Sequence, residues 1–307
     1  MRIIITGGTG LIGQALAASL AADGHDVIAL SRSLAQTSGL PAGVRVERWD
    51  ARTADGWGHL ADGADAIVNL AGATIGQRWT VEHKRAIRDS RLNAGRAVVE
   101  AVEQARVKPR VVVQASGIGY YGPHGDELLA EDAPPGDDFL GRTAVEWEAS
   151  TAPVEAFGVR RAVARTAVVL SLEGGSFPLM LLPFRLFAGG PFGNGRQWFP
   201  WIHIADQVQA LRFLIENQAA NGPFNLVSPG ILTNNAFAKS VGRVMGRPAF
   251  FRVPAFAPRL ALGEMASLLL DGQNAVPQRL LGLGFTFRFA EFDTALRDLL
   301  RKSIDSH

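Results

Sequence analysis

The sequence predicts an α/β fold, in which a doubly wound parallel sheet is followed by a smaller, mostly helical C-terminal lobe. Three observations predict it. Short apolar, β-branched runs alternate with helix-length stretches up to about residue 170, which is the pattern of a buried parallel sheet with crossover helices. The first run leads through a glycine-rich turn into a helical stretch. The chain of 307 residues is long enough for one large α/β domain and a second lobe.

The glycine-rich turn follows the β-branched run at residues 3–5 and leads into a helical stretch. Its glycines have the spacing G-x-x-G-x-x-G, at Gly7, Gly10 and Gly13. The first lets the chain turn off the strand, the second lets a pyrophosphate approach the backbone, and the third permits close packing of the helix. This pattern predicts a dinucleotide-binding (Rossmann) unit, with cofactor contacts from Gly7, Thr9, Gly10, Leu11, Ile12 and Gly13.

The second strand is expected at residues 26–32. It ends without the carboxylate that holds the ribose hydroxyls in NAD-specific sites, and Ser31 and Arg32 stand there instead. A carboxylate would repel the 2′-phosphate of NADP(H), whereas a hydroxyl and a guanidinium would bind it. The sequence therefore predicts NADP(H) as the cofactor. The alternative is that Arg32 is only a solvated surface residue.

Further strands are expected at residues 44–50, 66–72, 110–116 and 162–169, and long helices at residues 81–104 and 140–157. The strand at 66–72 ends in small residues, which leave room for a ligand at the carboxyl edge of the sheet. Leu70, Ala71 and Gly72 are therefore expected to contact the cofactor. Arg91, on the helix at 81–104, is either a ligand of the cofactor phosphates or a solvated residue on the helix face.

The strand at 110–116 ends at a hydroxyl, and two phenols follow it. In doubly wound folds the ligand-binding and catalytic residues lie just beyond the carboxyl ends of the central strands. Ser116 and Tyr120 are therefore the candidate catalytic residues, as groups that polarise a substrate oxygen. The alternatives are that Ser116 satisfies a strand-end carbonyl and that Tyr120 belongs to the core or to a pocket wall.

Residues 1–170 are predicted to form the NADP-binding domain, with residues 171–230 as a further source of strands. Residues 171–307 are predicted to form a substrate lobe, and a cleft between this lobe and the sheet would hold a small molecule. A helix is expected in this lobe at residues 206–217, with Asp206 as its N-cap. His203 and Asp206 could instead form a His–Asp pair, but a packed histidine beside a helix cap is the simpler interpretation.

Composition argues against several classes of protein. The chain has no cysteine, so disulfides and thiolate metal ligands are excluded, and the spacing of histidines and carboxylates indicates no metal site. The net charge is only +2, so no nucleic-acid partner is expected. Neither a secretory signal pattern nor a membrane-spanning run is found, so we expect a cytoplasmic protein without a membrane partner. The sequence is compatible with a monomer or a homodimer.

Several motifs resemble the extended short-chain dehydrogenase/reductase superfamily of nucleotide-sugar epimerases and dehydratases. They are the turn at residues 6–13, Asn69-Leu70-Ala71-Gly72 and Tyr121-Gly122. More narrowly, the chain resembles an atypical subgroup described as epimerase-family or cell-division-inhibitor-like proteins. The motifs that carry this resemblance are Tyr120-Tyr121-Gly122, Trp147-Glu148, Leu181-Leu182-Pro183-Phe184-Arg185 and Pro200-Trp201-Ile202-His203.

The C-terminal region, about residues 245–300, is similar to that subgroup's own C-terminal domain of unknown function. The similar motifs are Gly246-Arg247-Pro248-Ala249, Val253-Pro254, Leu270-Asp271-Gly272-Gln273 and Gly284-Phe285. The resemblance implies a Rossmann fold and a cofactor that is usually NADP(H), without an established substrate. It also implies that the helices at 81–104 and 140–157 lie where relatives form a dimer.

The chain departs from the superfamily in its catalytic pair, Tyr-x-x-x-Lys. The only tyrosines are Tyr120 and Tyr121, and the residues four positions later are His124 and Gly125. In the superfamily the lysine lowers the pKa of the tyrosine and holds the ribose, while the tyrosine transfers a proton. Glu148, on the helix where the pair is expected, either bonds the ribose hydroxyls in place of the lysine or pairs with a nearby arginine.

The leading hypothesis is an NADP(H)-binding oxidoreductase or epimerase/dehydratase-like enzyme. Its substrate would be a small carbonyl compound, an alcohol or a nucleotide sugar. The alternative is a non-catalytic NADP(H)-binding sensor or regulatory protein, which the missing Tyr–Lys pair favours. An enzyme would consume NADPH with a carbonyl compound or convert a bound sugar, whereas a sensor would bind the cofactor and alter a partner's binding.

Overall fold

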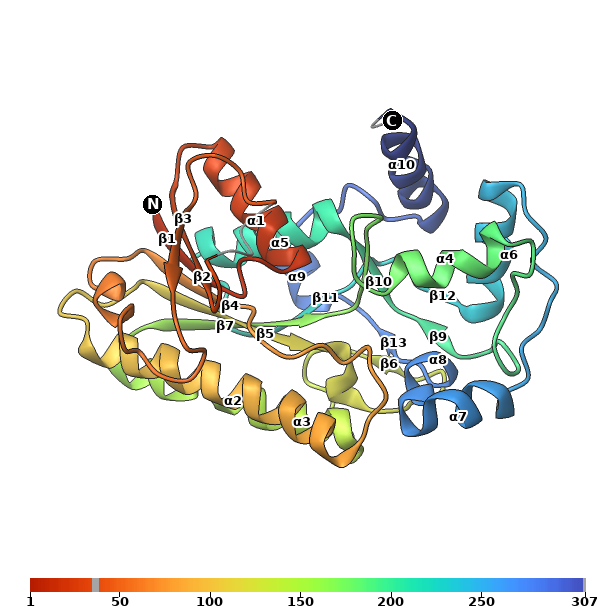
Figure 1. The fold of residues 1–307 in the computed structure, drawn as a ribbon, viewed down its shortest axis with the longest axis horizontal. Helices are drawn as coiled ribbons and strands as arrows, with labels where there is room; N and C mark the ends of the chain where they lie inside the picture. The colour runs from red at the N-terminus through yellow and green to blue at the C-terminus, as the bar shows by residue number, and fades with distance from the viewer. Residues whose placement is uncertain (35–38, 306–307) are drawn as a thin grey trace.

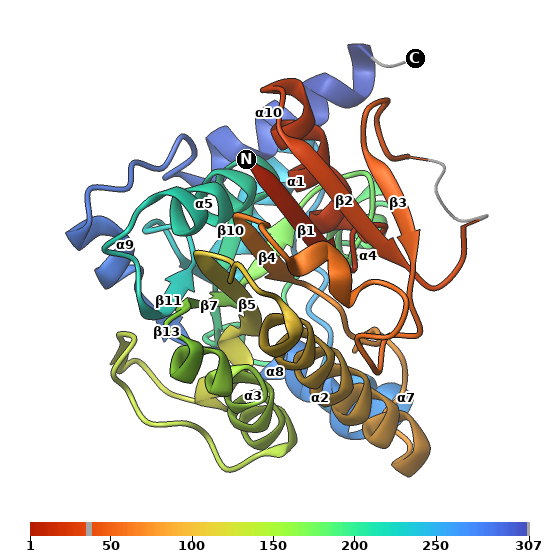
Figure 2. The same ribbon diagram turned by 90° about the vertical axis from the view of Figure 1, so that its left-hand side faces the viewer.

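The computed structural model describes residues 1–34 and 39–305 of the chain. Its main sheet has seven parallel strands in the order β11-β7-β5-β4-β1-β2-β3, as Figure 2 shows. The first strand, β1, lies inside the sheet between β4 and β2, and the chain winds outward from it in both directions, which is the doubly wound arrangement. The predicted fold class is therefore confirmed. The strands are β1 (Arg2–Thr6), β2 (Asp26–Ser31), β3 (Arg45–Arg48), β4 (Ala66–Asn69), β5 (Val111–Gly117), β7 (Arg160–Thr166) and β11 (Gly222–Leu226).

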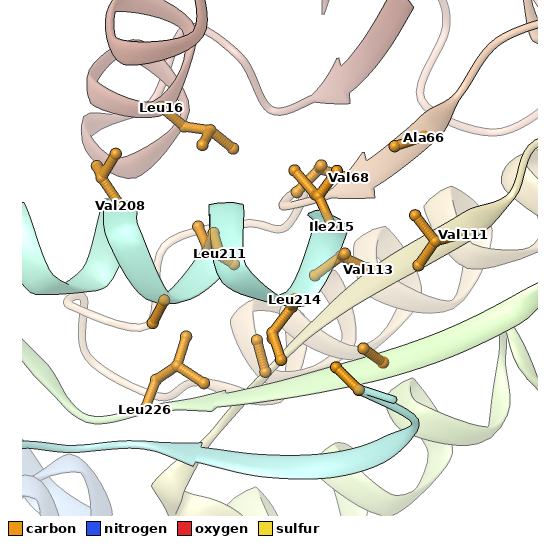
Figure 3. Close-up of a cluster of buried hydrophobic side chains, with 14 of the residues drawn as sticks. Leu16, Ala66, Val68, Val111, Val113, Val208, Leu211, Leu214, Ile215 and Leu226 are labelled. Atoms are coloured by element: carbon orange, nitrogen blue, oxygen red, sulfur yellow. The ribbon is translucent and has the colours of Figure 1, made fainter. Parts of the chain in front are cut away.

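Helices cover both faces of this sheet (Figure 1). One face carries α1 (Leu11–Ala22) and α5 (Ile204–Glu216), and the other carries α2 (Val81–Gln104) and α3 (Phe139–Ala149). The side chains between the layers are almost all fully buried, because the parallel strands are apolar on both faces. Figure 3 shows one of these layers, in which helical leucines and valines meet valines of the sheet. The labelled residues are Leu16, Ala66, Val68, Val111, Val113, Val208, Leu211, Leu214, Ile215 and Leu226.

The C-terminal half extends beyond the carboxyl ends of the strands as a second, mostly helical body (Figure 1). Its own core is rich in aromatic residues, including Phe177, Trp201, Phe237 and Phe292. Short strand pairs lie outside the main sheet: β8 (Val168–Leu170) with β10 (Trp201–His203), β9 (Trp198–Phe199) with β12 (Leu232–Thr233), and β6 (Leu128–Leu129) with β13 (Asn274–Ala275). The helices of the second body are α4 (Phe177–Arg185), α6 (Asn234–Met245), α7 (Phe256–Leu262), α8 (Ser267–Leu270) and α10 (Phe292–Asp305). The short helix α9 (Gln278–Gly282) returns to the main sheet, where Leu280 is buried in the same core as Phe224 of β11.

Two expected elements are divided in the structure. Residues 140–157 form α3 and then a separate 3-10 helix, η3 (Ala152–Phe157). Pro153 stands at the start of η3 and has no N–H with which to continue the ladder of α3. The strand expected at 162–169 also splits, because the chain leaves the main sheet after Thr166. The backbone N–H of Ala167 still bonds to Leu226, but that of Val168 bonds to Pro200, beside β10.

The expected N-cap of α5 is wrong. The helix begins at Ile204, and its cap is His203, whose Nδ1 accepts the N–H of Ala205 at 3.1 Å. Asp206 lies within the first turn of the helix and accepts the N–H groups of Arg288 and Phe289, each at 2.9 Å. His203 is buried and its Nε2 lies 3.5 Å from Asp298 on α10, so the structure contains the packed histidine that the sequence favours over a His203–Asp206 pair.

Over the described ranges, none of the helices combines the length and the apolarity needed to cross a membrane.

Candidate functional site

The glycine-rich turn between β1 and α1 is packed so tightly that its first and third glycines have no room for a side chain. Gly7 has φ +67°, and a Cβ there would lie 2.9 Å from the carbonyl carbon of Leu70. A Cβ on Gly13 would lie 2.4 Å from the carbonyl oxygen of Gly7, far inside van der Waals contact. These two glycines therefore hold the start of α1 against the turn, beside the end of β4.

The N-terminus of α1 opens onto this turn. Its N-cap is Gly10, and within the described chain no side chain caps it. The amide groups of the first helical turn, from Leu11 and Ile12 onward, therefore have no side-chain partner, and the positive end of the helix dipole lies beside them. Thr9 precedes them in the same turn. Such an uncapped helix start beside a glycine cradle fits the pyrophosphate of a dinucleotide.

A surface hollow of about 570 Å³ lies beyond the ends of β2 and β3. Arg32 and Arg48 both line it, and Arg48 is paired in register with Ser31. The exposed side chain of Arg32 thus has a second guanidinium as its neighbour in the hollow. The Ser31 hydroxyl is buried and donates to the carbonyl of Ser33 at 2.8 Å, so it belongs to the turn. The other lining residues are Glu47, Trp49, Asp50, Asp55 and Gly56.

A buried chain of polar side chains crosses the three central strands beneath the turn. The Thr6 hydroxyl donates to Asn69 at 2.6 Å, and the Asn69 amide donates to Gln114 at 2.8 Å. Thr6 also accepts the N–H of Ala71 at 3.3 Å, which fixes the backbone that leaves β4. This chain of bonds holds the ends of β1, β4 and β5, and with them Leu70 and Ala71, in one register.

Arg91 lies against Gly72 at the end of this segment, where a Cβ would come within 3.0 Å of its guanidinium carbon. The guanidinium donates to the carbonyls of Ala73 and Ile87 at 3.0 and 2.9 Å, and it lies 4.7 Å from the centre of the Trp147 ring. Burial lowers the pKa of Arg91 to about 10. In the described part of the chain, no carboxylate forms an ion pair with it. Arg91 is therefore a half-buried cation beside Gly72, where the chain leaves β4.

Ser116 and Glu148 meet beyond the end of β5. The Ser116 hydroxyl donates to Glu148 Oε1 at 2.7 Å. The same carboxylate receives two bonds from Arg165 of β7, at 2.9 Å to Oε1 and 3.0 Å to Oε2. Ser116 and Arg165 are neighbours in the β5–β7 register, so the sheet brings them together. Of the two expectations for Glu148, pairing with an arginine is the one that the structure contains.

The two tyrosines have different surroundings. Tyr121 is fully buried; its hydroxyl donates to Asn225 at 2.7 Å and accepts from Arg165 at 3.0 Å. Burial raises the pKa of Tyr121. Tyr120 is only partly buried, and the Arg165 guanidinium lies 3.4 Å from the centre of its ring. Ser116, Tyr120, Glu148 and Arg165 thus form one connected group at the carboxyl edge of the sheet.

Sequence reasoning missed Arg165 and Arg48. Arg165 is the one charged residue in the middle of an apolar strand pattern, and a buried cation in such a strand needs a partner carboxylate. That signal was available, but the identity of the partner depends on the packing of α3 against β5 and β7. Glu131 was also missed, because it lies in a loop rich in proline and glycine; it is buried and accepts the N–H groups of Asn225 and Arg279.

The C-terminal region closes one side of this group. Gln273 donates to the carbonyl of Gly122 at 2.9 Å, and the N–H of His124 donates to Gly272 at 3.2 Å. A Cβ on Gly272 would lie 2.2 Å from the carbonyl oxygen of Trp198. Residues 272–274 are therefore wedged between the loop that follows Tyr121 and strand β9.

Comparison with known families agrees with this geometry. The model of the NAD dependent epimerase/dehydratase family matches residues 3–227, which include the glycine turn and all seven strands of the main sheet apart from the first residue of β1. The chain belongs to this family. A second model, a domain of unknown function (DUF1731), matches residues 253–299 of this epimerase/dehydratase family member. The resemblance to atypical extended short-chain dehydrogenases/reductases is therefore confirmed.

Relatives of this family member cover nearly its whole length. The epimerase family protein YfhF of Bacillus subtilis is 38% identical over 99% of this chain and 100% of its own. The epimerase family protein SH2119 of Staphylococcus haemolyticus is 38% identical over 97% of this chain and 99% of its own. Among solved structures, human epimerase family protein SDR39U1 with NADPH has a TM-score of 0.86 and 35% identity, over 98% of this chain and 99% of the human one.

Proposed function

We propose that this protein is an NADP(H)-dependent oxidoreductase or epimerase/dehydratase-like enzyme that acts on a small carbonyl compound, an alcohol or a nucleotide sugar. The neighbouring guanidinium groups of Arg32 and Arg48 support the choice of cofactor. They line one hollow beyond β2, where this fold places the adenine ribose. The human relative, whose structure contains NADPH, supports the same choice.

The glycine cradle and the uncapped start of α1 would hold the pyrophosphate, and Arg91 would add a positive charge beside Gly72. The cofactor, when bound, would supply or accept the hydride. Ser116 is suited to polarise a substrate oxygen, because its hydroxyl donates to Glu148 Oε1 and its own oxygen stays free to accept a hydrogen bond from a substrate hydroxyl. When a carbonyl is reduced, Tyr120 would donate the proton to the substrate oxygen and regain one from water. In the oxidative direction Tyr120 would pass that proton to water.

The cofactor assignment is tested by titrating the purified protein with NADPH and with NADH and following nicotinamide fluorescence. Arg32→Ala should weaken NADPH binding by roughly tenfold or more, because it removes one hydrogen bond between charged groups. It should leave NADH binding unchanged, because NADH has no 2′-phosphate. Arg45→Ala is the matched control, because Arg45 is an exposed arginine at the other end of β3 that pairs with Asp26. Equal losses for NADPH and NADH in Arg32→Ala would contradict the assignment.

The catalytic assignment is tested by following NADPH oxidation with a panel of aldehydes, ketones and quinones. With any compound that is reduced, Ser116→Ala and Tyr120→Phe should each lower kcat by roughly tenfold or more while NADPH still binds. If both variants keep full turnover, the roles of Ser116 and Tyr120 are wrong. Tight NADPH binding without oxidation by any compound, and without conversion of a nucleotide sugar, would favour the sensor hypothesis.

A further inference from the structure

The C-terminal body carries large apolar side chains that face solvent. Two lie on α4, two follow it directly, and two lie in the segment after α6; their exposed fractions run from 47% to 74%. We call this set the apolar patch; it consists of Leu179, Leu182, Leu186, Phe187, Phe250 and Phe251. Single exposed leucines are ordinary, but a group of this size on one body marks a contact surface.

The exposed leucines of α4 and its C-cap follow the period of the helix. Leu179, Leu182 and the C-cap residue Leu186 are spaced by three and four residues, so they share one face. The opposite face, which includes Phe177 and Leu181, is fully buried in the aromatic core. Helix α4 is therefore apolar on two sides, and only one of them is used by the fold.

The two parts of the apolar patch lie side by side. The N–H of Phe251 donates to the carbonyl of Gly189 at 3.1 Å, and Phe192 and Val253 form a parallel bridge. The rings of Phe250 and Phe251 are 4.5 Å apart, so they form one apolar unit. In Figure 1 this surface lies at the right-hand end, where α4 and α6 are adjacent and the chain turns back toward α7.

The segments that build this surface contain no acidic residue. Neither residues 174–205 nor residues 217–263 include an aspartate or a glutamate. Their cations are Arg185, Arg196, Lys239, Arg243, Arg247, Arg252 and Arg259. Because the net charge of the whole chain is only +2, the rest of the chain is net negative and the positive charge is concentrated in these two segments, where Arg243 is paired with Asp293 of α10. Arg247 is part of the patch itself, since its guanidinium lies 4.3 Å from the centre of the Phe187 ring.

We propose that the apolar patch and its surrounding arginines bind the surface of an anionic lipid bilayer. Exposed leucine and phenylalanine side chains would enter the boundary between head groups and acyl chains, and the arginines would contact lipid phosphates. A second copy of the chain fits less well, because a two-fold contact would bring the same cations together. Such peripheral binding needs no spanning helix, and it departs from the expectation, drawn from the sequence, that no membrane is involved.

The test is co-sedimentation of the full-length protein with vesicles of phosphatidylcholine, either alone or with roughly 30% phosphatidylglycerol. The protein should pellet with the anionic vesicles and much less with the neutral ones. Leu182→Glu combined with Leu186→Glu should lower vesicle affinity at least about tenfold. Arg185→Gln combined with Arg247→Gln should lower it by about fivefold for each arginine, and the loss should shrink at high salt.

The matched control is Val107→Glu, which changes another exposed apolar residue, 65% exposed, in the turn between α2 and β5. It should leave vesicle binding unchanged, and all variants should keep the melting temperature and NADPH response of the parent. Protein that stays in the supernatant with both vesicles would overturn the proposal. So would equal binding of the Leu182→Glu/Leu186→Glu variant, or a concentration-dependent dimer that this variant abolishes without any vesicle binding.

Discussion

Arg165 and Glu148 form a two-point ion pair at the carboxyl edge of the sheet, with Nε 2.9 Å from Oε1 and Nη2 3.0 Å from Oε2. Their side chains are only 4% and 14% exposed. Ser116 adds a third bond to the carboxylate, and Tyr121 and the carbonyl of Glu131 accept from the guanidinium. The pair thereby connects β5, β7, α3 and the loop after β5 around the candidate catalytic residues.

Breaking this ion pair from one side should destabilise the fold strongly. Glu148→Ala leaves the Arg165 charge buried without its partner, so we expect a loss of about 3–5 kcal/mol in the free energy of unfolding. Urea denaturation measures this loss. Glu155→Ala breaks the more exposed pair with Arg161 and should cost less than about 1 kcal/mol. Losses of similar size in the two variants would show that the Arg165–Glu148 pair is not a structural centre.

Adding one methyl group at Gly13 should disrupt the cofactor cradle. The new Cβ would lie 2.4 Å from the Gly7 carbonyl oxygen, so the helix start must move. We expect Gly13→Ala to lose roughly 1–3 kcal/mol of stability and most of its NADPH binding. Gly282→Ala is the control, because no atom lies within 4 Å of a Cβ there. NADPH titration and urea denaturation of both variants measure these two losses. Unchanged NADPH binding in Gly13→Ala would contradict the role of the turn as a cofactor cradle.

Arg91→Gln should weaken NADPH and NADH by the same factor, roughly tenfold or more, because both cofactors carry the pyrophosphate that this cation would contact. This distinguishes Arg91 from Arg32, whose loss should affect NADPH alone. Arg88→Gln is the control from the same helix, since Arg88 pairs with Glu146 and Asp89. If Arg91→Gln binds both cofactors as tightly as the wild type, Arg91 does not contact the pyrophosphate and only packs against Trp147.

Asp206 should give the protein a measurable pH dependence. Burial raises the pKa of Asp206 in the folded chain, while hydrogen bonds from Arg288 and Phe289 oppose that rise. The folded state therefore binds this proton more tightly than the unfolded state, so its contribution to stability is complete below about pH 3.8 and is lost as the pH rises through the folded pKa. As the pH rises from about 3.8 through the folded pKa of Asp206, the free energy of unfolding of the wild type should fall relative to that of Asp206→Asn. Parallel urea denaturation series across pH would measure the difference, and a constant difference would contradict it.

Much of the fold was accessible from the sequence, because its periodic signals are strong. Thr80 caps α2 through His83 N, and the helix has the predicted bounds Val81–Gln104. The boundary errors have local causes, such as Pro153 in η3 and the turn of the chain out of the sheet after Thr166. The Arg165–Glu148 pair could not be predicted, because its partners are brought together only by strand register and by the packing of α3.

Part of the candidate site could be predicted because it consists of residues in local sequence patterns. The glycine turn, the strand ends and Ser116 follow from a local pattern, and the structure gathers them at one edge of the sheet. Arg48 could not be predicted as a cofactor ligand from the residues around it in the sequence. It becomes a candidate only because the parallel pairing of β2 and β3 places it beside Ser31. Glu131 lies in a loop rich in proline and glycine, yet it is buried because it accepts the N–H groups of Asn225 and Arg279, which are 94 and 148 positions away in the sequence.

The measurement that tests the central claim most directly is the pair of dissociation constants for NADPH and NADH on the unmodified protein, obtained by fluorescence titration at one ionic strength. The two guanidinium groups beyond β2 and β3 predict that NADPH binds at least about tenfold more tightly than NADH. Equal binding, or tighter binding of NADH, would contradict the assignment of Arg32 and Arg48 to a 2′-phosphate. Failure of both to bind would contradict the cofactor site itself.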